Sequence, residues 1–401
     1  MRIRSKIRRF KVRVTVASPV CISSGNSYGI LDYAFKGDKV LIIDYDKLLK
    51  SLTLTEREEL KRIINLTGLE AIWRVREFLS KKATSKVAKD SIELSPKARD
   101  KIERSIQKKS INKLEIEQTI KEGNIPFIPG SSLKGALRTA ILDAIAEELL
   151  KSEKRPDWLN RIIEEINEAI AQIGKDSQKD GKNILRRKSR ELEEWLLCKL
   201  KEKTVKELKQ KLKLKSISPT AGDPFRFIKV SDLFPVNKAK RKIRVLERKS
   251  ISTLAEFIEE GVFEGSIIVD EGQLKTVLEE IFKCSLKFEP TKEGIVSSLR
   301  KHFSHVFSYE KQFIGDIPPI LIKGTVKELV QRYNTEEGKK SLSIIKLGKF
   351  SGALAKTFKS EELRKIYNRK SETYQSEPTT AWLTEEKKIP GWCFIELEDA
   401  D

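Results

Sequence analysis

The chain has 401 residues, 39% of them apolar and 35% charged, which is the composition of a folded protein with room for two domains and excludes a disordered chain. Lysine and arginine number 80 against 59 acidic residues, so the formal net charge is +21 and nucleic acid is the first partner to consider. The four cysteines have no CxxC spacing and no long apolar run is present, which predicts a cytoplasmic protein with reduced thiols, no zinc site, no cofactor and no membrane span.

The first predicted element is a basic strand. Seven cations and no acid occur in residues 1–16, and apolar residues alternate with polar ones from Phe10 to Val16. A short buried strand is expected at 40–44, with helices between 47 and 78. Residues 80–120 are polar and charged, with a helix opening at Ser95-Pro96, and we interpret them as an insertion packed on the surface.

Residues 125–150 are predicted to form a turn followed by a helix. Pro129 and Gly130 mark the turn, and apolar residues then recur at every fourth position, so one face of the helix should be buried. Ser131 or Ser132 can cap the first amides of the helix. The spacing fits neither a P-loop nor a GxGxxG motif.

The start of this helix is a predicted phosphate site. It presents free amides and the positive end of the helix dipole, and Lys134 and Arg138 lie one turn apart beside them. Gly135 costs helix stability, so we expect it to admit the close approach of a backbone, from this chain or from a ligand. The alternative interpretation is a capped helix with two solvated cations.

The middle of the chain is predicted to alternate between helices and strands. Helical spacing continues to about residue 170, the basic stretch 174–190 is interpreted as a mobile loop or linker, and 191–215 as a lysine-rich helix. Further strands are expected at 223–232 and 263–269, a basic hairpin arm at 238–249, helices at 273–282 and 292–309, and a final strand at 391–397.

A second small-residue loop lies within residues 344–356, where we expect a strand, a loop and a helix. It resembles the first loop in combining two glycines with serine and lysine, and its own glycines are four apart, with a serine directly before the second glycine and a lysine at each end. The fold class expected is therefore α+β, a pair of RRM-like (ferredoxin-like) domains with helical insertions, in residues 1–215 and 216–401.

The string Pro-Gly-Ser-Ser-x-Lys-Gly-x-x-Arg, which begins at Pro129, resembles the glycine-rich loop of the RAMP superfamily of CRISPR-associated proteins. The order of the strand and loop at 15–25, the 223–232 run, Phe263-Glu264-Gly265 and Gly391-Trp392-Cys393 is similar to that in the subunit-five family of type III-A Csm complexes. The resemblance covers nearly the whole chain.

This resemblance implies a non-catalytic RNA-binding subunit that caps the 3′ end of the crRNA and the row of backbone subunits. It also implies contact with the adjacent backbone RAMP subunit, and a part in crRNA maturation and antiviral defence with trimming by recruited host nucleases. The RNP1 pattern is absent, so we expect recognition of RNA shape and backbone. The residues expected to contact crRNA or the adjacent subunit are Gly130, Ser131, Ser132, Lys134, Gly135 and Arg138 in the first loop, Gly348, Lys349, Ser351, Gly352 and Lys356 in the second, and Arg226 and Lys249 outside the loops.

The alternative function is a metal-independent endoribonuclease that processes CRISPR repeats. His302 and His305 could act as general base and acid, three residues apart on a predicted helix, but their apolar neighbours favour a core-edge or surface role. Asp32 follows a small-residue loop in a region where backbone subunits of such complexes carry a cleaving aspartate, and we interpret it as a residue that orders the loop.

Two further pairs of residues have structural interpretations. Asp44 and Asp46 are expected to cap a helix and complement its dipole rather than to bind a metal ion. Trp195 and Trp392 are expected to be anchors of the core or of a subunit interface rather than stacking platforms for bases.

Overall fold

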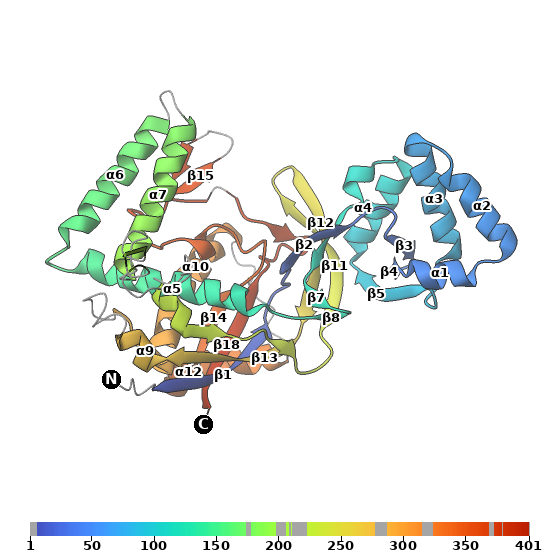
Figure 1. The fold of residues 1–401 in the computed structure, drawn as a ribbon. Coiled ribbons are helices and arrows are strands. Elements are labelled where there is room, and N and C mark those ends of the chain that lie inside the picture. Colours follow the sequence, from blue (N-terminus) through green and yellow to red (C-terminus); the bar gives the residue numbers. More distant parts are fainter. Residues whose placement is uncertain are drawn as a thin grey trace.

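The computed structural model describes residues 6–173, 178–197, 206–207, 210, 223–276, 287–314, 324–368, 373–378 and 380–400. The fold is mixed α+β with two curled sheets (Figure 1), which agrees with the predicted class. One sheet belongs to the main body, and the other runs from the main body into a lobe of helices and short strands at the far end of the molecule.

The basic strand predicted near the N-terminus is β1 (Ile7–Val16), the central strand of the six-stranded main sheet. Its alternation has the expected result, because Phe10, Val12 and Val14 are buried while Lys11 and Arg13 on the other face pair with Glu264 of the neighbouring strand. Its neighbours, both antiparallel, are β13 (Val262–Asp270) and β18 (Trp392–Ala400), and the outer strands are β9 (Ile228–Val230), β10 (Phe234–Pro235) and β14 (Leu342–Lys346).

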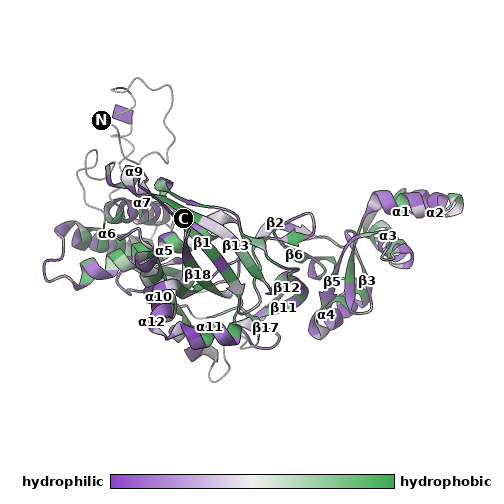
Figure 2. Cartoon of the chain, turned by 90° about the horizontal axis from the view of Figure 1, so that it is seen from below, coloured by the Kyte–Doolittle hydropathy of each residue, from purple (hydrophilic) through white to green (hydrophobic). Residues whose placement is uncertain are grey.

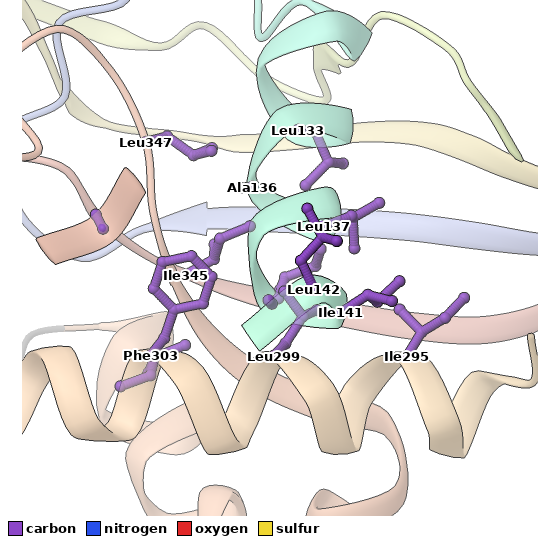
Figure 3. Packing of buried hydrophobic residues seen from close by; sticks show 14 of the residues in the cluster. Leu133, Ala136, Leu137, Ile141, Leu142, Ile295, Leu299, Phe303, Ile345 and Leu347 are labelled. Atoms are coloured by element: carbon purple, nitrogen blue, oxygen red, sulfur yellow. The ribbon is translucent and has the colours of Figure 1, made fainter. Parts of the chain in front are cut away.

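Two long helices pack with this sheet. They are α5 (Gly130–Lys151) and α10 (Lys292–Ile314). Figure 3 shows Leu137 and Ile141 of α5 facing Leu299 of α10, with strands of the sheet behind them. The periodic apolar face predicted for 125–150 is therefore the centre of the core.

The main sheet and its core take residues from both sides of residue 215, the boundary expected from the sequence. Strand β1 pairs with strands that follow it by more than 240 residues in the chain, as the register Val14↔Phe263 shows. One hydrophobic cluster extends from Phe10 to Leu397. The first half of the chain thus contributes its first strand and its longest helix to a body completed by the second half.

The second sheet has eight strands and joins the main body to the lobe. Its centre is the hairpin of β11 (Lys240–Arg248) and β12 (Ile251–Glu260), and β11 confirms the basic hairpin arm predicted at 238–249. The other strands are β2 (Ser23–Tyr28), β3 (Tyr33–Lys36), β4 (Lys39–Ile43), β5 (Ala88–Leu94), β6 (Ile116–Thr119) and β17 (Leu383–Thr384). Two small sheets pair β7 (Lys121–Glu122) with β8 (Ile125–Pro126) and β15 (Ile366–Asn368) with β16 (Thr373–Gln375).

The lobe corrects the interpretation of residues 80–120 as a surface insertion. Ile92, Ile102 and Ile116 from this stretch are fully buried in the lobe's own hydrophobic cluster, so the segment is a core component. The helix predicted at Ser95-Pro96 is present, with the Ser95 hydroxyl accepting from the Ala98 amide. The lobe helices are α1 (Tyr45–Ser51), α2 (Leu54–Ile64), α3 (Gly68–Lys82) and α4 (Pro96–Gln107), followed by the short η1 (Ile111–Lys113).

The stretch 174–190, predicted to be a mobile loop or linker, is helical from residue 178 on, and residues 174–177 lie outside the described residues. It belongs to α7 (Gln178–Leu196), which packs beside α6 (Asp157–Ile173) (Figure 1). The sequence analysis gave weight to the basic residues and overlooked an apolar stripe, in which Leu185, Leu192 and Leu196 recur at helical spacing and are buried. The lysine-rich helix predicted for 191–215 agrees with α7 as far as Leu196, and most of its remainder lies outside the described residues.

The remaining helices border the main body. They are α9 (Glu271–Thr276), α11 (Thr325–Tyr333), α12 (Glu336–Ser341) and the short 3₁₀ turns η2 (Pro224–Phe227) and η4 (Leu354–Lys356). The helix predicted at 273–282 is seen only to Thr276, because the rest lies outside the described residues, and the helix expected after the second loop is only η4.

Hydropathy follows the layers of the structure. Figure 2 shows green and purple residues alternating along the strands of the main sheet, as expected for strands with one buried face. Cys21 and Cys393 are free and buried, and burial raises the pKa of each thiol to about 12; Cys198 and Cys284 lie outside the described residues. No helix within the described ranges is both long and apolar enough to cross a membrane.

Candidate nucleic-acid interface

The two glycine-rich loops, which come from opposite halves of the chain, line one groove of about 570 Å³. We call it the loop groove. Its wall from α5 consists of Ser131, Ser132, Gly135, Ala136 and Thr139, and its wall from the second loop consists of Lys346, Leu347, Gly348, Lys349, Ser351, Ala355 and Lys356, with Ile22 and Ser23 between them.

The start of α5 is fixed by packing rather than by a serine cap. The amide of Gly130 donates to Asp232 Oδ1 at 2.7 Å, and a Cβ on Gly130 would lie 2.3 Å from the Val230 carbonyl oxygen. The expectation that Ser131 or Ser132 caps the helix is wrong, because both lie inside its first turn, and the carboxylate of Asp232 accepts from its first amide instead. Both serines instead line the groove.

Gly135 has a different environment from Gly130. It is exposed, and a Cβ added to it would meet no atom of the described chain within 4 Å. Nothing in the packing therefore requires glycine in the second turn of α5, where alanine would be more stable by about 1 kcal/mol. The bare backbone leaves the groove open at this point.

The second loop is held by backbone contacts. The amide of Lys349 donates to the Cys21 carbonyl oxygen at 2.9 Å, and a Cβ on Gly348 would lie 2.4 Å from that same oxygen. Gly348 and Gly352 have φ values of 95° and 80°, which L side chains rarely adopt. Both glycines are required by the loop's conformation, which sets the second wall of the groove.

Three lysines give the groove its charge. Lys349 Nζ lies 2.7 Å from Glu117 Oε2, with the lysine side chain about half exposed. Such a pair is weak enough for a phosphate to compete for the lysine. Burial lowers the pKa of Lys356, so its ammonium would gain from an anionic partner. Lys346 lies deeper and is engaged within the protein.

Lys346 forms a buried ion pair with Glu310 beneath the groove. The indole Nε1 of Trp392 donates to the other Glu310 oxygen at 3.1 Å. Burial lowers the pKa of Lys346 and raises that of Glu310, and each charge opposes the shift of the other. Trp392 is fully buried, which confirms its expected role as a core anchor.

Lys134 and Arg138 occupy a different face of α5 and do not line the loop groove. The Arg138 guanidinium donates to Asp223 and Glu193, each at 2.9 Å, and covers the Phe225 ring. Burial lowers the pKa of Lys134. The two cations expected to flank a phosphate are thus separated from the serines and Gly135, and carboxylates of this chain already bind Arg138.

The two residues predicted outside the loops also lie apart. Arg226 is exposed on η2, with its guanidinium 5.4 Å from the Phe227 ring centroid. Lys249 is in the turn between β11 and β12 with a φ of 53°, and it lines a neighbouring cavity. The sequence analysis missed two residues that line the groove, Thr139 and Ser23. Thr139 lies four residues after Gly135, so the helical spacing could have indicated it.

The candidate catalytic residues have structural roles. His302 is 1% exposed, and its Nδ1 lies 2.8 Å from Asp143 Oδ2, which ties α10 to α5. His305 is exposed, and burial of part of its ring and the charge of Arg364 lower its pKa. Asp32 accepts from the Gly29 amide at 2.6 Å, which confirms that it orders its loop.

The residues considered as metal ligands or anchors agree with their structural interpretation. Asp44 accepts from the Lys47 amide at 3.1 Å as the cap of α1, and Asp46 lies in the first turn of that helix. No group of acidic, histidine and cysteine side chains in the described part of the chain has the arrangement of a metal site. Trp195 stacks on Trp158 at 5.4 Å between α7 and α6.

Comparison with known proteins gives a consistent picture. A protein named CRISPR system Cms protein Csm5, from Methanocaldococcus jannaschii, is 28% identical over 176 residues, which are 42% of this chain and 38% of that protein. The match therefore spans well under two thirds of that relative's length.

Two solved structures share the fold. One is a chain of the Csm-crRNA-target RNA ternary complex of a type III-A CRISPR-Cas system, with a TM-score of 0.57 and 21% identity over 97% of this chain and 100% of that chain. The other is Csm5 of T. onnurineus, with a TM-score of 0.55 and 18% identity over 95% and 99%. The family model described as the RAMP superfamily matches residues 13–374. Since that range is most of the chain, the protein belongs to the RAMP superfamily, within which it is Csm5-like.

Proposed function

We propose that this chain is the Csm5-like subunit of a type III-A Csm complex, where it holds the 3′ end of the crRNA and caps the row of backbone subunits without cutting RNA. Its partners would be crRNA, the other Csm subunits, the adjacent backbone RAMP subunit above all, and the host nucleases that trim the crRNA. The similarity to Csm5 and to a chain of a Csm-crRNA-target RNA complex supports this assignment.

The observation that carries the proposal is the loop groove. Two loops predicted from separate parts of the sequence to bind phosphate meet there, and they place serine hydroxyls, an uncovered helix backbone and Lys349 and Lys356 around one space. These are donors and charges suited to phosphate and ribose, and they carry no base code. The net charge of +21 provides the long-range attraction for a polyanion.

The fold fits the same proposal. In the main body, β1, α5, β9, β13, α10 and β18 occur in this order along the chain, with other elements inserted between them, as strand, helix, strand, strand, helix, strand, and β18 and β13 lie on either side of β1. This is the connectivity of a ferredoxin-like unit, and we propose that it is one RRM-like domain and that the second sheet is the core of the other. The burial of His302 against Asp143 supports a role for it in packing rather than in RNA cleavage.

The test uses the full chain and labelled single-stranded RNA of the CRISPR repeat. Replacing Lys349 and Lys356 with alanine should weaken binding and reduce the slope of log K against log salt by about 1.4, since each phosphate contact on a single strand contributes about 0.7. The matched control removes the same charge from exposed Lys301 and Lys327, which do not line the groove, and should leave the slope within error.

Two results would overturn the proposal. An unchanged salt slope in the Lys349 and Lys356 variant would show that the groove does not hold the strand. Cleavage of the repeat RNA by the purified chain with EDTA present, abolished by His302→Ala or His305→Ala, would favour the endoribonuclease alternative. Binding without cleavage, together with recovery of the chain in a crRNA-containing complex, is the expected outcome.

A further inference from the structure

A second cavity, of about 620 Å³, shares the loop 346–356 with the loop groove. Lys346, Lys349 and Lys356 line both spaces, so a chain that crosses this loop can contact the two in succession. The lining of the second cavity is different from that of the groove. It includes the rings of Phe350, Tyr367 and Trp382, the side-chain amides of Asn368 and Gln375, and the basic turn between β11 and β12.

The aromatic rings are held in fixed orientations. Phe350 is buried and meets Trp382 edge to face, with centroids 5.5 Å apart and an interplanar angle of 72°. The Arg248 guanidinium lies 4.6 Å from the Trp382 centroid. Tyr367 packs against Tyr374 at 5.2 Å across the β15–β16 hairpin. Trp382 and Tyr367 are only partly buried, so each presents a preorganised ring to the cavity.

The amides are positioned by the same hairpin. Asn368 Nδ2 donates to Gln375 Oε1 at 3.3 Å, which orients both groups beside Tyr367. Carboxamides carry both donors and acceptors and are the side chains that pair with the edges of nucleobases. Lys249, which the sequence singled out, also lines this cavity and adds a positive charge to it.

We infer that this cavity takes one unpaired nucleotide of the RNA strand, with its base against Tyr367 and Trp382 and its flanking phosphates on Lys349 and Lys356. The inference rests on the proposed RNA-binding function and adds a base site to it. The cavity is of a size usual for small-molecule sites, which fits a single nucleotide. Stacking on aromatic rings is tolerant of sequence, and the amide pair supplies hydrogen bonds at the base edge.

The test is a series of labelled repeat RNAs in which one nucleotide after another is replaced by an abasic ribose. With the full chain, loss of the base at one register should weaken binding roughly 5- to 150-fold, the range of base–aromatic stacking. Tyr367→Ala should lower affinity for intact RNA to that for the abasic RNA and remove the dependence on position. Trp382→Ala should have the same effect, and Trp382→Phe should restore the affinity for intact RNA. Tyr367→Ala keeps the test valid if the change at Trp382 disturbs Phe350.

The controls separate this inference from the proposed function. Replacing Lys349 and Lys356 should weaken intact and abasic RNA by the same factor. If every abasic RNA bound as tightly as intact RNA while the Lys349 and Lys356 variant still bound RNA more weakly, the base site would be overturned and the RNA-binding proposal would stand. If replacing these two lysines left the RNA affinity unchanged, the RNA-binding proposal itself would be overturned. The inference would also be refuted if a free nucleoside 5′-monophosphate bound saturably and lost its binding in the Trp382 variant, while all abasic RNAs bound like intact RNA. That result would assign the cavity to a free nucleotide.

Discussion

Replacing Gly135 with alanine separates the demands of folding from those of RNA binding. A Cβ at this position meets nothing within 4 Å in the described chain, so the change creates no clash in the protein. Gly135 lies in the helix α5 and lines the loop groove. If an RNA backbone lies against it, the added methyl group should stabilise the protein and weaken its complex.

The substitution should change protein stability and RNA affinity in opposite directions. Alanine in place of glycine in a helix interior should raise the free energy of unfolding by about 0.8–1 kcal/mol. A methyl group forced into a close contact costs about 1–3 kcal/mol, which corresponds to a roughly 5- to 150-fold loss of RNA affinity. Chemical denaturation would measure the first effect, and fluorescence anisotropy with labelled single-stranded RNA the second.

The control is Ser308→Ala, which adds helix propensity at an exposed position of α10 outside the groove. It should raise stability slightly and leave the RNA dissociation constant unchanged. An unchanged dissociation constant for Gly135→Ala would refute the reasoning, because it would mean that no ligand backbone approaches this end of the groove. A loss of stability would show that the space beside Gly135 is filled within the protein.

Lys346→Met should destabilise the fold by about 3–5 kcal/mol in urea, because it leaves Glu310 buried without its cation, and the double variant with Glu310→Leu should recover most of the loss; equal stability of the single variant and wild type would contradict this. Gly348→Ala should cost about 1–3 kcal/mol and weaken RNA binding, since its Cβ would lie 2.4 Å from the Cys21 carbonyl oxygen, and an unperturbed melting curve would be evidence against this account of the loop. Burial opposes ionisation of Glu271, but bonds to neighbouring cations outweigh it and lower its pKa to about 2 from 4.5, so wild type should exceed Glu271→Gln in stability by about 1–2 kcal/mol at neutral pH. That difference should shrink as the pH falls from 4.5 towards 2 and would be constant if the carboxylate played no part.

Local patterns were read correctly where one element determined them. The alternation of apolar and polar residues from Phe10 predicted β1, and the apolar residues at every fourth position from Leu133 predicted the buried face of α5. Composition was a poorer guide than periodicity in 174–190, where many cations suggested a loop although Leu185 and Leu192 mark a helix face. The same bias assigned residues 80–120 to the surface.

The candidate site shows where a sequence stops being informative. Both glycine-rich loops were identified, but their meeting in one groove depends on the strand pairing of β1 with β18 and of β18 with β14. For a related reason, the sequence could not show that Lys134 and Arg138 lie outside the groove that the two serines line. Residues one turn apart on a helix share a side of it, and it is the neighbours Asp223 and Glu193, distant in sequence, that determine what Arg138 binds.

The amino-acid order by itself determined the charge that attracts a polyanion, the basic strand, the two glycine-rich loops and the apolar face of α5, because each depends on residues close together in the chain. The tertiary structure decided which lysines border the groove, which cations are paired with carboxylates, and that aromatic rings and amides enclose a second cavity beside it. Those outcomes depend on contacts between segments far apart in the chain, whose alignment is set by sheet register and core packing and leaves no local pattern to read.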